Sequence, residues 1–201
     1  QTDSVAKLKA LAERPGLTAE ARLKILAVLI RTGALADAEF ALRQEPNNAA
    51  LAEAWVATAR LRPGLDYGPL VRAWLARPEP FAQATACRVI AVAGKDYGAL
   101  PKLEAWLAEG TAAEVRRAAI SAYARLRKAE SLTRLAPLLE AADSTVRDAA
   151  LAALAPHAPA AVAEGSGARL EACRDGSAVG PIFAPLLELK GGPALLAQAL
   201  T

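Results

Sequence analysis

The sequence predicts an all-α protein, a right-handed α-solenoid in which antiparallel helical hairpins stack one on the next. Two pairs of internal repeats lead to this prediction. DYGPLVRAWLA at 66–76 returns as DYGALPKLEAWLA at 96–108, and EVRRAAISAYARL at 114–126 returns about 31 residues later as TVRDAALAALAPH. A repeat in this range is typical of stacked helical hairpins. The composition agrees, because alanine, the best helix former, supplies about a quarter of the chain.

Apolar residues at helical spacing, separated by glycine, proline and capping residues, predict a helix in each repeat position. These helices are expected at 4–13, 18–31, 34–44, 48–61, 67–76, 80–93, 97–108, 111–127, 130–142 and 144–154. Asn47 and Asp143 are expected to cap the helices that follow them, and Thr111 with Glu114 to form a capping box. The loops are short, so successive helices are expected to be antiparallel neighbours.

Residues 1–155 would then form a solenoid of about five hairpins. The segment PHAPAAVAEGSG at 156–167 is expected to break the pattern, with weaker helices at 168–174, 178–189 and 193–200. We interpret 156–201 as an irregular helical cap of the same domain, because end repeats are usually atypical. The alternative is a separate small domain, although about 45 residues give only a marginal core.

One apolar stripe recurs in the repeats and explains why they stack. It runs along one face of the helix at 111–127 through Val115, Ala118, Ala119, Ala122 and Leu126. A single hairpin cannot bury such a face, whereas stacked hairpins bury it in a continuous core. Trp74 and Trp106 occupy equivalent places in their repeats, and we expect them to pack between repeats rather than to hold a ligand.

The overall composition excludes two classes of protein. With 54% apolar residues the chain has enough material for a core, which argues against disorder. No apolar run, such as the one at residues 25–30, approaches the roughly 20 residues that span a bilayer, so we expect no membrane span.

The chain opens with QTDS and contains no methionine. Such a start fits the residues that follow a signal-peptidase site, which predicts a periplasmic or secreted protein. The alternative is a trimmed sequence from a cytoplasmic protein. Cys87 and Cys173 could pair in an exported protein, but they lie almost three repeats apart, and we expect two free, buried thiols instead.

The segments VRRAAISAYARL and DSTVRDAA resemble the second helix of a HEAT-like repeat. Val115, Arg116, Ala118 and Ala119 carry the likeness in the first copy, and Asp143, Val146, Arg147, Ala149 and Ala150 carry it in the second. The resemblance implies that Asp143 caps its helix and that Asp143 forms part of a repeat ladder with Arg116 or Arg147. The likeness is clear over 96–155 and weaker over 61–95. The period of about 31 residues is similar to that of short bacterial HEAT-like repeats.

The segment at 32–50 differs from the rest of the array. TGALADAEFALRQEPNNAA is similar to the second helix of a tetratricopeptide repeat, through Ala38, Ala41, Leu42, Pro46 and Asn47, although the helix is a turn too short. Both families imply the same helical-solenoid architecture.

Charge is unevenly distributed along the chain. Residues 61–130 contain eleven Lys or Arg and seven Asp or Glu, and the excess gathers on one helix and its exit, at Arg116, Arg117, Arg125, Arg127 and Lys128. These five residues are the candidate binding surface, a cationic patch for phosphates or an acidic protein. The alternative is structural: Arg116 belongs to the repeat ladder, and cations at a helix C-terminus complement the helix dipole.

We find no motif for catalysis or for a bound cofactor or metal. His157 is the only histidine, it lies beside Pro156 without a second ligand at metal-binding spacing, and we expect it to have no role. Nucleophile elbow, phosphate loop and CxxC patterns are absent. The sequence therefore predicts that the protein is not an enzyme and needs no cofactor.

The function predicted from these observations is a non-catalytic scaffold that binds a protein or peptide on the concave face of the solenoid. The alternative is a nucleic-acid-binding HEAT-like protein, of the base-excision type, that uses the cluster Arg116–Lys128. A weaker third hypothesis is an assembly accessory that oligomerises through its ends.

Overall fold

A computed structural model describes residues 2–32, 34–172 and 179–199 of the chain. All regular structure in these residues is helical and none of it is strand, which confirms the all-α prediction and is consistent with an α-solenoid. The right-handed sense stays a prediction. The chain divides into two compact units, Gln1–Ala99 and Leu100–Thr201. A division at residue 155 stays a prediction as well.

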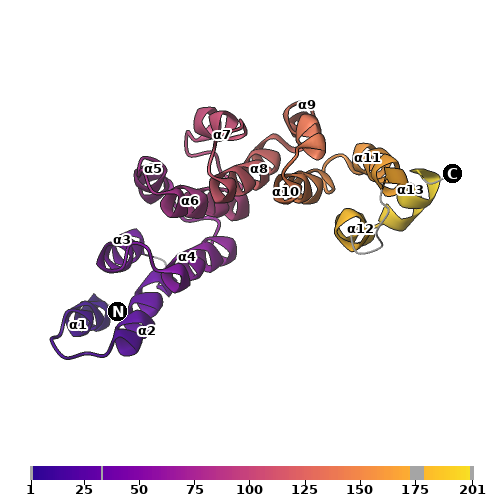
Figure 1. Cartoon of the computed structure of the whole chain (residues 1–201). Coiled ribbons are helices and arrows are strands. Elements are labelled where there is room, and N and C mark those ends of the chain that lie inside the picture. The colour runs from indigo at the N-terminus through magenta and orange to yellow at the C-terminus, as the bar shows by residue number, and fades with distance from the viewer. Residues whose placement is uncertain (1, 33, 173–178, 200–201) are drawn as a thin grey trace. The chain divides into compact units, whose positions relative to one another are not determined.

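The first unit consists of helical hairpins. They are α1 (Thr2–Ala12) with α2 (Ala19–Arg31), α3 (Leu35–Gln44) with α4 (Ala49–Leu61), and α5 (Gly68–Leu75) with α6 (Pro80–Ala93). The second helices α2, α4 and α6 pack on one another in succession, and each first helix packs against the second helix of its own hairpin (Figure 1). Leu26, Leu51, Trp55 and Ile90 are fully buried in this unit. The core is therefore continuous through the stack, as the repeated stripe requires.

Capping residues set the ends of these helices. The side chain of Asn48 accepts hydrogen bonds from the main-chain N–H groups of Ala50 and Leu51, so Asn48 is the N-cap of α4 and the prediction of Asn47 is wrong by one residue. The reason is geometric, because an N-cap side chain reaches only the second and third N–H groups of its helix. At the end of α6, Gly94 adopts the left-handed conformation (φ 66°) that glycine tolerates best.

The second unit begins with α7 (Leu100–Trp106) and α8 (Ala113–Arg127). The capping box predicted at Thr111 is wrong: α8 starts two residues later, after Ala112, which makes no side-chain cap. The helix predicted at 130–142 is broken into the 3₁₀ helix η1 (Lys128–Ser131), α9 (Leu132–Leu135) and the 3₁₀ helix η2 (Ala136–Glu140). Pro137 accounts for the last break, because a proline removes an N–H donor and clashes with the preceding turn.

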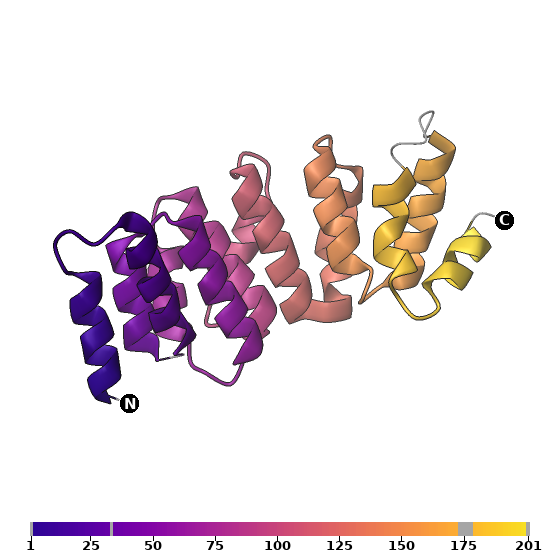
Figure 2. The same cartoon turned by 90° about the horizontal axis from the view of Figure 1, so that it is seen from below.

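The end of the chain is more helical than predicted. After α10 (Ser144–Leu154) come α11 (Pro159–Ala172), α12 (Val179–Leu187) and α13 (Gly192–Ala199). Most of the predicted break at 156–167 lies inside α11, which opens with Pro159 at the first helical position, where a proline loses no hydrogen bond. α12 packs on α10, and α13 packs on α11 (Figure 2). Over the described residues, no helix has the length and apolarity needed to cross a membrane.

Candidate functional site

The structure separates the five predicted surface cations into two sets. Arg117, Arg125 and Lys128 are exposed, whereas Arg116 and Arg127 are half-buried. The exposed residues follow one another at spacings of eight and three along α8 and its end, so they lie along one side of the helix. We call these three residues the cationic stripe. Among the described residues, no carboxylate lies within ion-pair distance of any of them.

Arg116 faces inward and joins the two helices of its hairpin. Its Nε donates a hydrogen bond of 2.9 Å to the main-chain oxygen of Leu107, just after the end of α7. The equivalent residue of α10, Arg147, donates to the carbonyls of Ala141 (2.7 Å) and Ala142 (3.0 Å) after η2. Gln83 holds the same place in α6 and donates to the carbonyl of Arg77 at 2.7 Å. The fourth residue of each of these second helices therefore fastens the preceding loop.

Arg127 is also engaged within the unit. Its guanidinium lies 3.9 Å from Glu104 of α7 and 3.6 Å from Glu130 of η1. The hydroxyl of Tyr123, a buried residue, lies 3.4 Å from the same Glu104 carboxylate. Arg127 thus belongs to a polar group between α7 and α8, in which two carboxylates lie within ion-pair distance of its guanidinium.

The repeat-ladder residue Asp143 caps α10, as the sequence predicts. Its Oδ1 accepts a hydrogen bond of 2.8 Å from the main-chain N–H of Thr145. The pKa of Asp143 is lowered, first by the Thr145 side chain and main-chain N–H and least by the charge of Arg116. Arg116 and Asp143 therefore interact across neighbouring hairpins through charge. Their part in a longer ladder stays a prediction, since the described hydrogen bonds of Arg116 and Arg147 go to main-chain carbonyls.

His157 lies near one end of the cationic stripe, which sequence reasoning missed. Burial lowers its pKa below 6.5, and the charges of Arg125 and Lys128 lower it further. α8 and α10 pack against each other, so the residues after their C-terminal ends come together. The repeat in the sequence could have indicated this proximity, because His157 follows the end of α10 closely, as Lys128 follows the end of α8.

The backbone of Lys128 is unusual at the same place. Lys128 is the C-cap of α8 and adopts φ 50° and ψ −125°, in the positive-φ region that favours glycine. A non-glycine residue there costs on the order of 1–3 kcal/mol. The stripe therefore ends in a lysine at a position where the backbone favours glycine.

The tryptophans of the two similar segments have different surroundings. Trp74 is buried and meets Trp55 of the preceding hairpin edge to face, with ring centroids 5.1 Å apart. This contact confirms packing between repeats for Trp74. Trp106 is half-buried, and the ammonium of Lys102 lies 5.9 Å from its ring.

The structure describes one of the two cysteines. Cys87 is a fully buried free thiol, and burial raises its pKa to about 12, so the thiol stays protonated at neutral pH. Cys173 lies outside the described residues. In the part of the chain that the structure describes, no three His, Cys, Asp or Glu side chains gather as a metal site would require.

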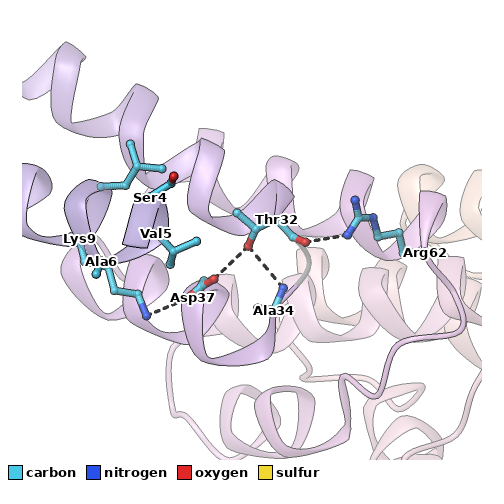
Figure 3. A pocket seen from close by; sticks show the side chains of 9 residues that line it. Ser4, Val5, Ala6, Lys9, Thr32, Ala34, Asp37 and Arg62 are labelled. Atoms are coloured by element: carbon cyan, nitrogen blue, oxygen red, sulfur yellow. Dashed lines mark hydrogen bonds and ion pairs between the residues drawn. The ribbon is translucent and has the colours of Figure 1, made fainter. Parts of the chain in front are cut away.

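A groove in the first unit is the feature that sequence reasoning missed altogether. It has a volume of about 910 Å³ and lies between α1, the start of α3 and the end of α4 (Figure 3). The lining residues are Ser4, Val5, Ala6, Leu8, Lys9, Thr32, Ala34, Asp37 and Arg62. A volume of this size is within the range of ligand pockets.

Polar contacts hold the groove in shape. Asp37 is only 6% exposed, and its carboxylate lies 2.6 Å from the Lys9 ammonium and 3.1 Å from the Thr32 hydroxyl. Arg62 donates a hydrogen bond of 2.6 Å to the main-chain oxygen of Thr32 (Figure 3). These bonds fix α1 to α3 and place one guanidinium at the edge of the groove. No sequence motif marks them, because Lys9, Asp37 and Arg62 are far apart along the chain.

Comparison with known proteins assigns the repeats. A search of curated proteins and a search of solved structures found no match to the chain. The family model described as HEAT repeats matches residues 68–155, which run from the start of α5 to just after α10. Residues 68–155 therefore match HEAT repeats, and this match together with the stacked helical hairpins supports a HEAT-like repeat protein.

Proposed function

We propose that the chain is a non-catalytic scaffold that binds a protein or peptide, with the cationic stripe as its main contact surface. HEAT repeats generally mediate protein–protein interactions, and proteins built from them are typically non-catalytic. The finer assignment to Arg117, Arg125 and Lys128 rests on their charge and exposure.

One observation carries this assignment. Arg116 and Arg127 make hydrogen bonds or ion pairs within their own unit, whereas the three stripe residues make no ion pair with a described carboxylate. Unpaired cations on one helix face attract anionic partners over distances comparable with the Debye length, about 8–10 Å. The charges of the stripe are therefore free to pair with a partner, whereas Arg116 and Arg127 already have contacts within their unit.

The spacing of the stripe indicates the chemistry of that partner. Arg117 and Lys128 are eleven residues apart, so the stripe runs roughly 17 Å along the helix axis. An acidic protein segment with several Asp or Glu residues spans such a distance and gives each cation a carboxylate. Arginine at two of the three positions favours this pairing, because the guanidinium binds carboxylates with two parallel hydrogen bonds.

The experiment is a capture assay from lysate, with and without nuclease, that compares three forms of the chain. These are the wild type, the stripe variant Arg117→Gln/Arg125→Gln/Lys128→Gln, and a control variant Arg14→Gln/Arg43→Gln/Arg134→Gln that removes three exposed cations elsewhere. We expect one stoichiometric acidic protein that survives nuclease and is lost only in the stripe variant. Equal capture by all three forms would overturn the assignment.

Nucleic acid is the second candidate, because the same three cations can contact phosphates. The two candidates differ in salt dependence and in their response to nuclease. Three phosphate contacts predict that the logarithm of the binding constant falls with the logarithm of salt concentration with a slope of about −3. Recovery of nucleic acid that is lost in the stripe variant would favour this candidate over the protein scaffold.

The cellular location proposed from the sequence, periplasmic or secreted with cytoplasmic as the alternative, is tested by fractionating the cells that make the protein. Detection in the cytoplasmic fraction alone would contradict export.

A further inference from the structure

The groove in the first unit has one uncompensated charge. Asp37 and Lys9 neutralise each other at 2.6 Å, so neither attracts a charged ligand strongly. Arg62 is exposed and uses one N–H for the carbonyl of Thr32, and among the described residues no carboxylate lies within ion-pair distance of it. A guanidinium carries five N–H donors, so its planar fork can still receive a carboxylate.

On the α1 side, beside Ser4 and Lys9, the groove has an aliphatic wall. Val5, Ala6 and Leu8 of α1 line the groove together with Ala34, which precedes α3. Val5 and Leu8 are only half-buried, so a ligand that covers them removes further apolar surface from water. The groove therefore presents an aliphatic wall and one cation.

We propose that this groove binds an extended peptide segment of another protein, with an aliphatic side chain against Val5 and Leu8 and a nearby acidic side chain on Arg62. The charge of Arg62 and the apolar wall together define this occupant, because a basic segment leaves Arg62 without a carboxylate and a fully polar segment leaves the wall in water. The volume of about 910 Å³ accommodates several residues of such a segment. Polar lining groups, such as the Ser4 hydroxyl, can form hydrogen bonds with the main chain of the bound segment.

This peptide site goes beyond the scaffold function assigned to the cationic stripe. It lies in the first unit, whereas the stripe lies in the second, and the two share no residue. Either site can fail experimentally without the other, and the stripe variant therefore serves as a control for the groove.

The test begins with a phage-displayed library of short random peptides, panned against the full chain. Enriched peptides are expected to contain an aliphatic residue next to or one residue from Asp or Glu. Synthetic copies are then measured by fluorescence polarisation against Arg62→Gln, Val5→Ser, Arg60→Gln and the stripe variant. Arg62→Gln removes the charge, and Arg60→Gln removes an exposed cation nearby.

We expect affinity to fall about tenfold or more in Arg62→Gln and in Val5→Ser, and to stay within about twofold in Arg60→Gln and in the stripe variant. Amide chemical shifts of the wild type should move at Val5, Leu8 and Ala34 when the peptide is added, which tests the site without any substitution. No enrichment, enrichment of basic peptides, unchanged affinity in Arg62→Gln, or shifts confined to other residues would each overturn the proposal.

Discussion

The Nε of Arg116 donates a hydrogen bond to the main-chain oxygen of Leu107 across 2.9 Å and so fastens the second helix of a hairpin to the loop that precedes it. Arg147 and Gln83 make the same kind of bond from the same helical position in their own hairpins. An arginine that looks like part of a cationic surface in the sequence is thus a structural residue in the fold.

The first prediction separates this structural role from surface charge. Arg116→Met should lower the free energy of unfolding by about 1.5–3 kcal/mol, because it removes a charge-assisted hydrogen bond and leaves a carbonyl unpaired. The neighbouring Arg117→Met, which removes an exposed charge from the same helix, should change it by less than about 0.5 kcal/mol. Urea unfolding followed by circular dichroism measures both. Equal losses in the two variants would contradict the role given to Arg116.

The second prediction concerns the backbone at Lys128. Lys128→Gly should raise the free energy of unfolding by about 1 kcal/mol, because glycine adopts φ 50° without the strain that a lysine suffers there. The same change should weaken binding of the acidic partner. Lys128→Ala is the control: it loses the charge and keeps the strain, so binding should fall without a gain in stability. Thermal unfolding measures the change in stability, and the affinity for the partner, measured on the same samples, gives the change in binding.

A third prediction compares the two tryptophans of the similar segments. Trp74→Ala should cost about 3–5 kcal/mol of unfolding free energy, because the ring is buried against Trp55. Trp106→Ala should cost less, about 1–2 kcal/mol, because the ring is half-exposed. A double-mutant cycle between Trp55 and Trp74 should give a coupling of about 0.5–1.5 kcal/mol. No coupling would mean that the edge-to-face contact contributes nothing to the stacking.

The sequence predicted the parts of the fold that depend on local pattern. Helices with strong apolar periodicity, such as α6 (Pro80–Ala93), have the predicted bounds, and the Asp143 cap is confirmed. The errors occur where local signals compete. Asn47 and Asn48 are both good caps, and only the path of the chain decides between them. Glycines at 165 and 167 suggested a break, yet α11 continues through them, packed against α12 and α13.

The candidate site was only half predictable, for a physical reason. The sequence located five cations on α8 and at its end, but which of them face α7 depends on the helix phase and on partners such as Leu107 and Glu104. The groove could not be predicted, because Lys9, Asp37 and Arg62 come together only when α1, α3 and the end of α4 pack against one another.

A fourth prediction uses His157 as a reporter of the stripe. Its pKa lies below 6.5, so protonation is harder in the folded than in the unfolded protein, and its contribution to stability is full above pH 6.5 and is lost as the pH falls through the lowered pKa. In Arg125→Gln/Lys128→Gln the pKa should rise, although burial, the larger cause, keeps it below 6.5. Binding of an acidic partner to the stripe should also raise it.

Nuclear magnetic resonance can follow the pKa of His157 directly, since it is the only histidine in the sequence and gives a single imidazole signal. An Arg117→Gln variant is the matched control, because the charge of Arg117 is not among the causes of the His157 shift. A pKa that does not move in Arg125→Gln/Lys128→Gln would show that these cations do not lie beside the imidazole.

Two sets of substitutions on α8 and its end show which cations form the contact surface. The captured partner is titrated into the stripe variant Arg117→Gln/Arg125→Gln/Lys128→Gln and into Arg116→Gln/Arg127→Gln, and the unfolding free energy of each is measured alongside. We expect the first variant to bind at least about tenfold more weakly with unchanged stability, and the second to lose stability while it binds within about twofold of the wild type. Full binding by the stripe variant, or an equal loss of binding in both variants, would contradict the claim that the exposed cations form the contact surface.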